Sequence, residues 1–205
     1  VSAAIPIAIA PFTLNNGADP SSAVVGQVIE QDLQRSGLFS VLPAADHPQK
    51  LTYNTAISYP LWRSELGADY VVLGAVQKTG SGGATGYMVS VQLADVYKGS
   101  VMAAYQVATD RNGIRAAGHQ IANFLYEKLT GKKGMFASQL AWVQVSGVGK
   151  ARTYRLMMAD SDGFDPKALV TANYPLLSPS FSRDGKQLAY AVIQNGQSAI
   201  YVQNI

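Results

Sequence analysis

The chain has 205 residues, of which 48% are hydrophobic and 14% are charged, and its formal net charge is +3. This apolar fraction suffices for a folded core, whereas the small charge, with no basic run longer than Lys132-Lys133, argues against nucleic-acid binding. The absence of cysteine excludes disulfides, thiolate metal sites and cysteine nucleophiles, and no apolar run approaches the roughly 20 residues of a membrane span. We therefore expect no membrane insertion.

The chain opens with an apolar run over residues 5–12, typical of a buried strand, followed by the turn sequence Asn15-Asn16-Gly17. Asp19 can cap the next helix, Pro20 suits its first position, and Gly37 is placed to end it. Its predicted apolar face consists of Val24, Val25, Val28, Ile29 and Leu33, with Asp32 pointing outward.

The region up to residue 134 continues with further strands and helices. The predicted elements are a strand at 38–42, a short helix at 60–66, strands at 69–76, 87–96 and 101–107, and a helix that Asp110 caps and Gly131 ends. The glycine-rich segment 80–86 lacks the Lys-Ser or Lys-Thr of a phosphate loop and precedes a strand, which indicates a hairpin loop. Residues 1–134 are thus predicted to form an α/β domain, a mixed sheet covered by helices.

Residues 135–205 contain no helical pattern and carry an internal repeat. In the stretch 177–190, an Asp184-Gly185 turn joins a strand around Phe181 to an alternating strand. Residues 140–143 match 188–191, and residues 156–158 match 200–202, at a spacing of roughly 45 residues that suits propeller blades. We therefore predict an all-β segment holding the first blade and part of the second blade of an incomplete β-propeller.

Several motifs follow one another along the whole chain: the apolar start at 5–12, Asp32-Leu33-Gln34-Arg35-Ser36-Gly37-Leu38-Phe39, the strand at 67–72, Tyr126-Glu127-Lys128-Leu129-Thr130-Gly131, and the blade segments 160–163 and 178–185. In this order they resemble the TolB family of periplasmic propeller proteins of the Tol-Pal system. The blade motif alone is shared by many propellers, so its combination with the N-terminal region carries the resemblance.

The resemblance implies a periplasmic adaptor without catalytic activity or cofactor. In this family the propeller binds the peptidoglycan-associated lipoprotein, and an N-terminal extension contacts the inner-membrane protein TolA. The family supports outer-membrane integrity and constriction during division, and colicins exploit it for import. Val1 begins almost on the first strand, so we expect the TolA-contacting extension to be absent from these residues, and the family's six-bladed propeller to be truncated. Unpaired strand edges would then continue into further sequence or be completed by another chain.

Two alternatives remain open from the residues. The blades could be the gating propeller of a prolyl-oligopeptidase-like serine peptidase whose catalytic domain is missing. Residues 1–134 could also be a stand-alone binding module similar to lipoprotein activators of cell-wall synthesis.

No residue is predicted to be catalytic, to bind a cofactor or to bind a metal, and the partner-binding residues are unknown. His119 is expected to pack beside an apolar helix face, and His47 is expected to be solvated in a loop. The Asp160–Asp165 run lacks the later glutamate of a calcium loop and is interpreted as a blade turn. The aromatic and methionine residues of the blades could be interface anchors but are more typical of blade core: Trp142, Tyr154, Tyr174, Phe181, Met157 and Met158.

Overall fold

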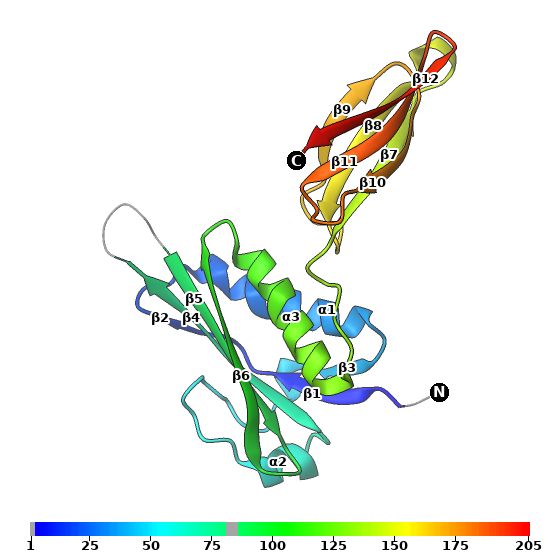
Figure 1. Cartoon of the computed structure of the whole chain (residues 1–205). Coiled ribbons are helices and arrows are strands. Elements are labelled where there is room, and N and C mark those ends of the chain that lie inside the picture. The colour runs from blue at the N-terminus through cyan, green and yellow to red at the C-terminus, as the bar shows by residue number, and fades with distance from the viewer. Residues whose placement is uncertain (1–2, 81–85) are drawn as a thin grey trace. The chain divides into compact units, whose positions relative to one another are not determined.

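The computed structural model describes residues 3–80 and 86–205, which form two compact units, Val1–Ala137 and Ser138–Ile205 (Figure 1). We call them unit 1 and unit 2. Most of the glycine-rich segment that was predicted to be a hairpin loop, residues 81–85, lies outside the described residues.

Unit 1 is built on one mixed sheet, as predicted. Its strands are β1 (Ile5–Ile9), β2 (Thr13–Asn15), β3 (Phe39–Leu42), β4 (Tyr70–Thr79), β5 (Gly86–Asp95) and β6 (Ser100–Asp110). The order is β3-β1-β4-β5-β6, with β2 also paired to β4. β1 runs parallel to β3 and β4, whereas β4, β5 and β6 form an antiparallel meander. The three-residue β2 was not predicted, because so short a strand shows no periodicity.

Both faces of this sheet are covered. Strand alternation sends Ile7 and Ile9 to one face and Ala8 and Ala10 to the other. The first face packs against α1 (Val24–Arg35) and α3 (Ile114–Thr130), which lie together on one side of the sheet (Figure 1). The second face packs against the fully buried Trp62 of the short helix α2 (Tyr59–Ser64). The fold class predicted for this region is confirmed.

The ends of the helices follow the local sequence with one exception. Asp19 accepts the backbone N–H of Ser21 and caps a 3-10 turn, η1 (Pro20–Ala23), that leads into α1. Gly131 adopts a positive φ of 72° after α3, the left-handed conformation that glycine favours. The prediction that Asp110 caps α3 is wrong, because β6 extends to Asp110 and the N-cap is Gly113. Asp110 Oδ1 instead accepts the backbone N–H groups of the turn between them.

Unit 2 contains two three-stranded antiparallel sheets. The first consists of β7 (Gln139–Ser146), β8 (Thr153–Asp160) and β9 (Lys167–Ala172), and the second of β10 (Leu176–Phe181), β11 (Gln187–Gln194) and β12 (Gln197–Asn204). Besides the 3-10 turns η2 (Ala44–Asp46) and η3 (Gly149–Ala151), these elements complete the secondary structure of the described ranges. A propeller blade has four strands, so the predicted incomplete propeller is confirmed.

The internal repeat corresponds to equivalent strands of the two sheets. Residues 140–143 and 188–191 lie in β7 and β11, and residues 156–158 and 200–202 lie in β8 and β12. In the first sheet, β9 follows the repeated strands β7 and β8. In the second sheet, β10 precedes the repeated strands β11 and β12. Leu188, Tyr190 and Val192 alternate into a common core with Leu156 and Leu176.

Candidate functional site

The close crossing of α1 and α3 positions the most buried polar side chains of unit 1. Gly118 of α3 faces Val28 of α1, and a Cβ atom added to Gly118 would lie 2.9 Å from Val28 Cγ1. Because Gly118 has no side chain, the backbone of α3 lies directly against the side chain of Val28 and close to the carbonyl oxygen of Val25. The next residue, His119, consequently reaches α1.

His119 and Asp32 form a buried pair. His119 Nδ1 lies 2.6 Å from Asp32 Oδ2, and the two side chains are 3% and 1% exposed. The other carboxylate oxygen, Oδ1, accepts a hydrogen bond of 2.6 Å from Nη2 of Arg35, which is 43% exposed. Both oxygens of a buried carboxylate are thereby satisfied, as burial requires. We call these three residues the Asp32 cluster.

The predicted outward position of Asp32 is wrong. Asp32 is fully buried, whereas the prediction followed its charge and not its place on the helix. It stands four residues after Val28 and three after Ile29, so helical geometry places it on the apolar stripe. That spacing was the signal in the sequence: an aspartate on such a stripe needs a buried donor, and only the fold could identify it as His119.

The Asp32 cluster joins two helices that are distant in sequence. A carboxylate that engages an imidazole through Nδ1 also occurs as the orienting half of catalytic triads. Here the donors belong to α1 and α3, and the contacts fix one helix against the other. The expectation that His119 packs beside the apolar face agrees with its burial.

His47 is only partly solvated, in contrast to the prediction. Its ring is half-buried, Nε2 lies 3.2 Å from the carbonyl oxygen of Leu42, and the ring meets Trp62 edge-on at 5.0 Å between centroids. Burial lowers the pKa of the imidazole. The loop folds back onto the α2 side of the sheet, which local sequence could not reveal.

The acidic run at the end of β8 lies in a turn, as predicted. Gly163 has a φ of 80° and donates its N–H to the carbonyl oxygen of Asp160 at 2.8 Å, and Asp162 Oδ1 accepts the N–H of Phe164. Tyr154, Tyr174 and Phe181 pack against the core of unit 2. Met157 is buried in β8, whereas Trp142 and Met158 are half-buried.

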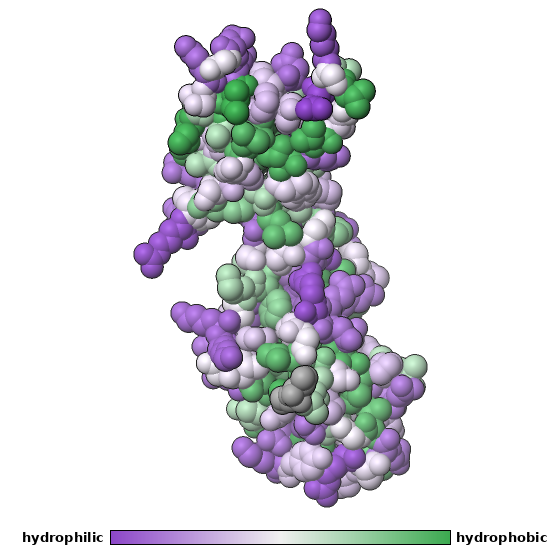
Figure 2. All heavy atoms as spheres, turned by 90° about the vertical axis from the view of Figure 1, so that its right-hand side faces the viewer, coloured by the Kyte–Doolittle hydropathy of each residue, from purple (hydrophilic) through white to green (hydrophobic). Residues whose placement is uncertain are grey.

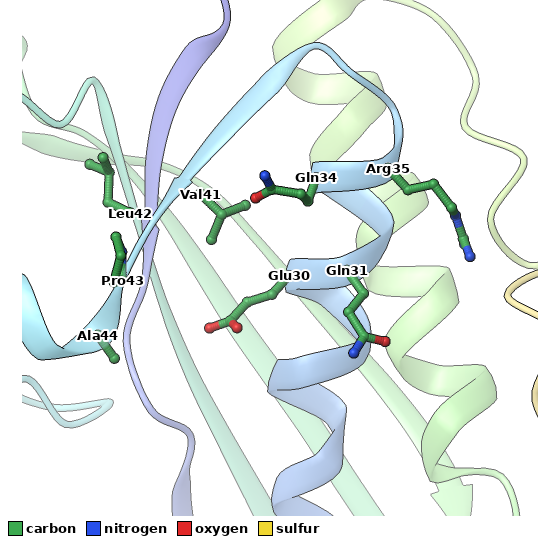
Figure 3. A pocket seen from close by; sticks show the side chains of 8 residues that line it. All are labelled: Glu30, Gln31, Gln34, Arg35, Val41, Leu42, Pro43 and Ala44. Carbon is green, nitrogen blue, oxygen red and sulfur yellow. The ribbon is translucent and has the colours of Figure 1, made fainter.

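A groove of about 420 Å³ separates the outer side of α1 from the edge strand β3 (Figure 3). Glu30 and Gln34 point toward β3, whereas Arg35 extends away from it. Burial raises the pKa of the half-buried Glu30 carboxyl. The remaining walls are formed by Gln31 of α1 and by Val41, Leu42, Pro43 and Ala44.

No helix within residues 3–80 and 86–205 is both long and apolar enough to cross a membrane.

Two family models match the chain in succession. The model of the TolB amino-terminal domain matches residues 1–102, and that of the TolB beta propeller domain matches residues 126–205. The first match ends within β6, and the second begins in the last part of α3 and includes all of unit 2.

The chain is also similar to proteins over its full length. The Tol-Pal system proteins TolB of Xanthomonas oryzae pv. oryzae and Xanthomonas euvesicatoria pv. vesicatoria are each 41% identical to it over 204 residues. These matches cover 100% of this chain and 46% of each relative. The crystal structure of TolB from Acinetobacter baumannii superposes with a TM-score of 0.82 at 32% identity, covering 100% of this chain and 48% of that one. The chain thus spans about half the length of its curated relatives.

Proposed function

The chain belongs to the TolB family, and we propose that it acts as a non-enzymatic protein–protein adaptor of the Tol-Pal system in the periplasm. The observation that carries this proposal is the similarity to Tol-Pal system TolB proteins through both units in the same order. A match to the propeller alone would give weaker support for this function, because propellers serve many functions.

The chemistry of the residues supports an adaptor over an enzyme. The sequence has no cysteine and two histidines. Both of these histidines are part of packing contacts, His119 between two helices and His47 against Trp62. The serine-peptidase alternative, the gating propeller of a prolyl-oligopeptidase-like enzyme, is not favoured, because the similarity includes unit 1 as well as the blades.

We propose the partners that the family relationship implies. The propeller, which begins with residues 135–205, binds the peptidoglycan-associated lipoprotein, and an N-terminal extension preceding the domain of residues 1–134 binds TolA. The adaptor thereby links inner-membrane Tol proteins to the cell wall, supports outer-membrane integrity and constriction during division, and is exploited by colicins. Figure 2 shows that hydrophobic side chains gather on one face of unit 2.

Titration calorimetry with the protein expressed from its complete reading frame tests the proposal. We expect saturable binding of the periplasmic domain of the peptidoglycan-associated lipoprotein from the same organism. We also expect that a strain lacking the protein leaks periplasmic enzymes and that the complete gene restores retention. Absence of binding together with an intact outer membrane in the deletion strain would refute the adaptor function.

A further inference from the structure

Strand β3 leaves one side of its backbone open. It pairs with β1 and is the last strand of the sheet on that side. The N–H of Ile5 donates to the carbonyl oxygen of Leu38 at 2.8 Å. Because successive peptide groups of a strand point to alternate sides, the N–H and C=O groups of Phe39 and Val41 face away from β1. Within the part of the chain that the structure describes, β3 has no second strand partner.

The open edge of β3 runs along the groove beneath α1. The side chains of Phe39 and Val41 belong to the sheet face that α1 covers, and Val41 lines the groove directly. A strand added beside β3 would therefore place every second side chain next to the outer side of α1. Glu30 and Gln34 are the side chains of α1 that point to this place (Figure 3).

Glu30 supplies a charge that the groove leaves without a counterpart. Its carboxylate is half-buried, and no hydrogen bond or ion pair of Glu30 occurs among the described residues. Arg35, the cation on the groove wall, is bound to Asp32 instead. A desolvated carboxylate without a partner favours a ligand with a lysine or arginine, and the adjacent Val41 and Pro43 favour aliphatic neighbours.

We propose that the β3 edge and the groove below α1 form a docking site for an extended segment of a partner protein, which adds to the sheet as a strand and places a lysine or arginine against Glu30. Backbone hydrogen bonds to Phe39 and Val41 provide the affinity, and the groove selects the side chains. The site consists of residues of unit 1 only and does not depend on the Tol-Pal assignment. It would give the protein a second interaction surface.

Selection from a library of random peptides of about ten residues, displayed on phage, tests the site on the 205-residue chain. We expect the enriched peptides to carry lysine or arginine flanked by β-branched residues. The best peptide, synthesised with a fluorescent label, should protect the amides of Phe39 and Val41 from hydrogen exchange. The amide of Ser40, which faces β1, should change little.

Four variants test separately the charge of Glu30, the backbone N–H of Val41 and the stability of the fold. Glu30→Gln should weaken peptide binding about ten-fold. Val41→Pro removes an outward N–H and keeps the hydrogen bonds between β3 and β1, and it should weaken peptide binding by at least about ten-fold. Val41→Thr keeps the N–H and should bind within about three-fold of the parent, and Glu127→Gln on the exposed side of α3 should bind like the parent. Because burial raises the pKa of Glu30, Glu30→Gln should also stabilise the fold at pH 7, so its lost binding cannot reflect unfolding.

Three outcomes would overturn the proposal. The first is a library selection that enriches no peptide. The second is enriched peptides whose affinity is unchanged by Val41→Pro. The third is tighter peptide binding or new self-association in Glu30→Gln, which would identify Glu30 as a charge that keeps other strands away from the edge.

Discussion

Substitution of Asp32 by alanine removes the carboxylate that joins α1 to α3 and leaves the Nδ1 side of His119 facing the space it occupied. The lost contacts are the 2.6 Å bond to His119, which is 3% exposed, and the 2.6 Å bond to Arg35, which is 43% exposed. The solvent-screened arginine contributes at most about 1 kcal/mol. Removing the acceptor from a buried hydrogen-bonding group costs about 1–3 kcal/mol. With the arginine contact included, we therefore expect unit 1 to lose about 1–4 kcal/mol of its unfolding free energy.

Urea unfolding measures this loss if the signal comes from unit 1 alone. The chain has two tryptophans, Trp62 in the core of unit 1 and Trp142 in β7, so a Trp142→Phe background isolates the fluorescence of Trp62. With a slope of about 2 kcal/mol per molar urea, the midpoint should fall by about 0.5–2 M.

A double-mutant cycle separates the pair from other effects of the substitution. Asp32→Ala and His119→Ala together should destabilise by about 1 kcal/mol less than the sum of the single variants, because each single substitution already breaks the contact between the two side chains. Strict additivity of the two, or a midpoint for Asp32→Ala within about 0.25 M of the parent, would refute the reasoning.

Three further predictions follow from other contacts. Burial lowers the pKa of His47 below its ordinary value of 6.5, so the native state binds fewer protons than the unfolded state, and unfolding free energy should fall as pH drops below about 6.5. Urea midpoints at about pH 7.5 and 5.5 should show this fall in the parent and a smaller one in His47→Gln. Gly118→Ala should lower the unfolding free energy by about 1–3 kcal/mol, because its new methyl group meets Val28. The double variant Gly118→Ala with Val28→Ala should lose less unfolding free energy than the sum of the two single variants, and additive losses would contradict the contact. Light scattering should show concentration-dependent self-association of the 205-residue chain through β12 and a monomer after Ile200→Lys and Val202→Lys, whereas a monomeric parent would argue against an adhesive edge.

Sequence periodicity located most elements because each depends on neighbours along the chain. Alternating apolar residues identified β11 before its partners were known, since Leu188, Tyr190 and Val192 are all buried. The same reasoning failed for Asp32, because a residue's charge says nothing of a donor that comes from a helix far along the chain. It failed for His47 too, whose burial depends on contacts with Leu42 and Trp62.

The sequence by itself determined the order of most strands and helices, the presence of an α/β part followed by a propeller part, and, through ordered motifs, the family. These properties depend on local periodicity, turn residues and repeats, and each can be inferred from a window of the chain. Only the tertiary structure decided that Asp32 meets His119. Among the residues that the structure describes, it also decided that β3 ends the sheet and that Glu30 has no ion pair beside the open edge of β3. Such properties arise where distant segments pack together, because the same side chain is solvated or buried according to which segment covers it.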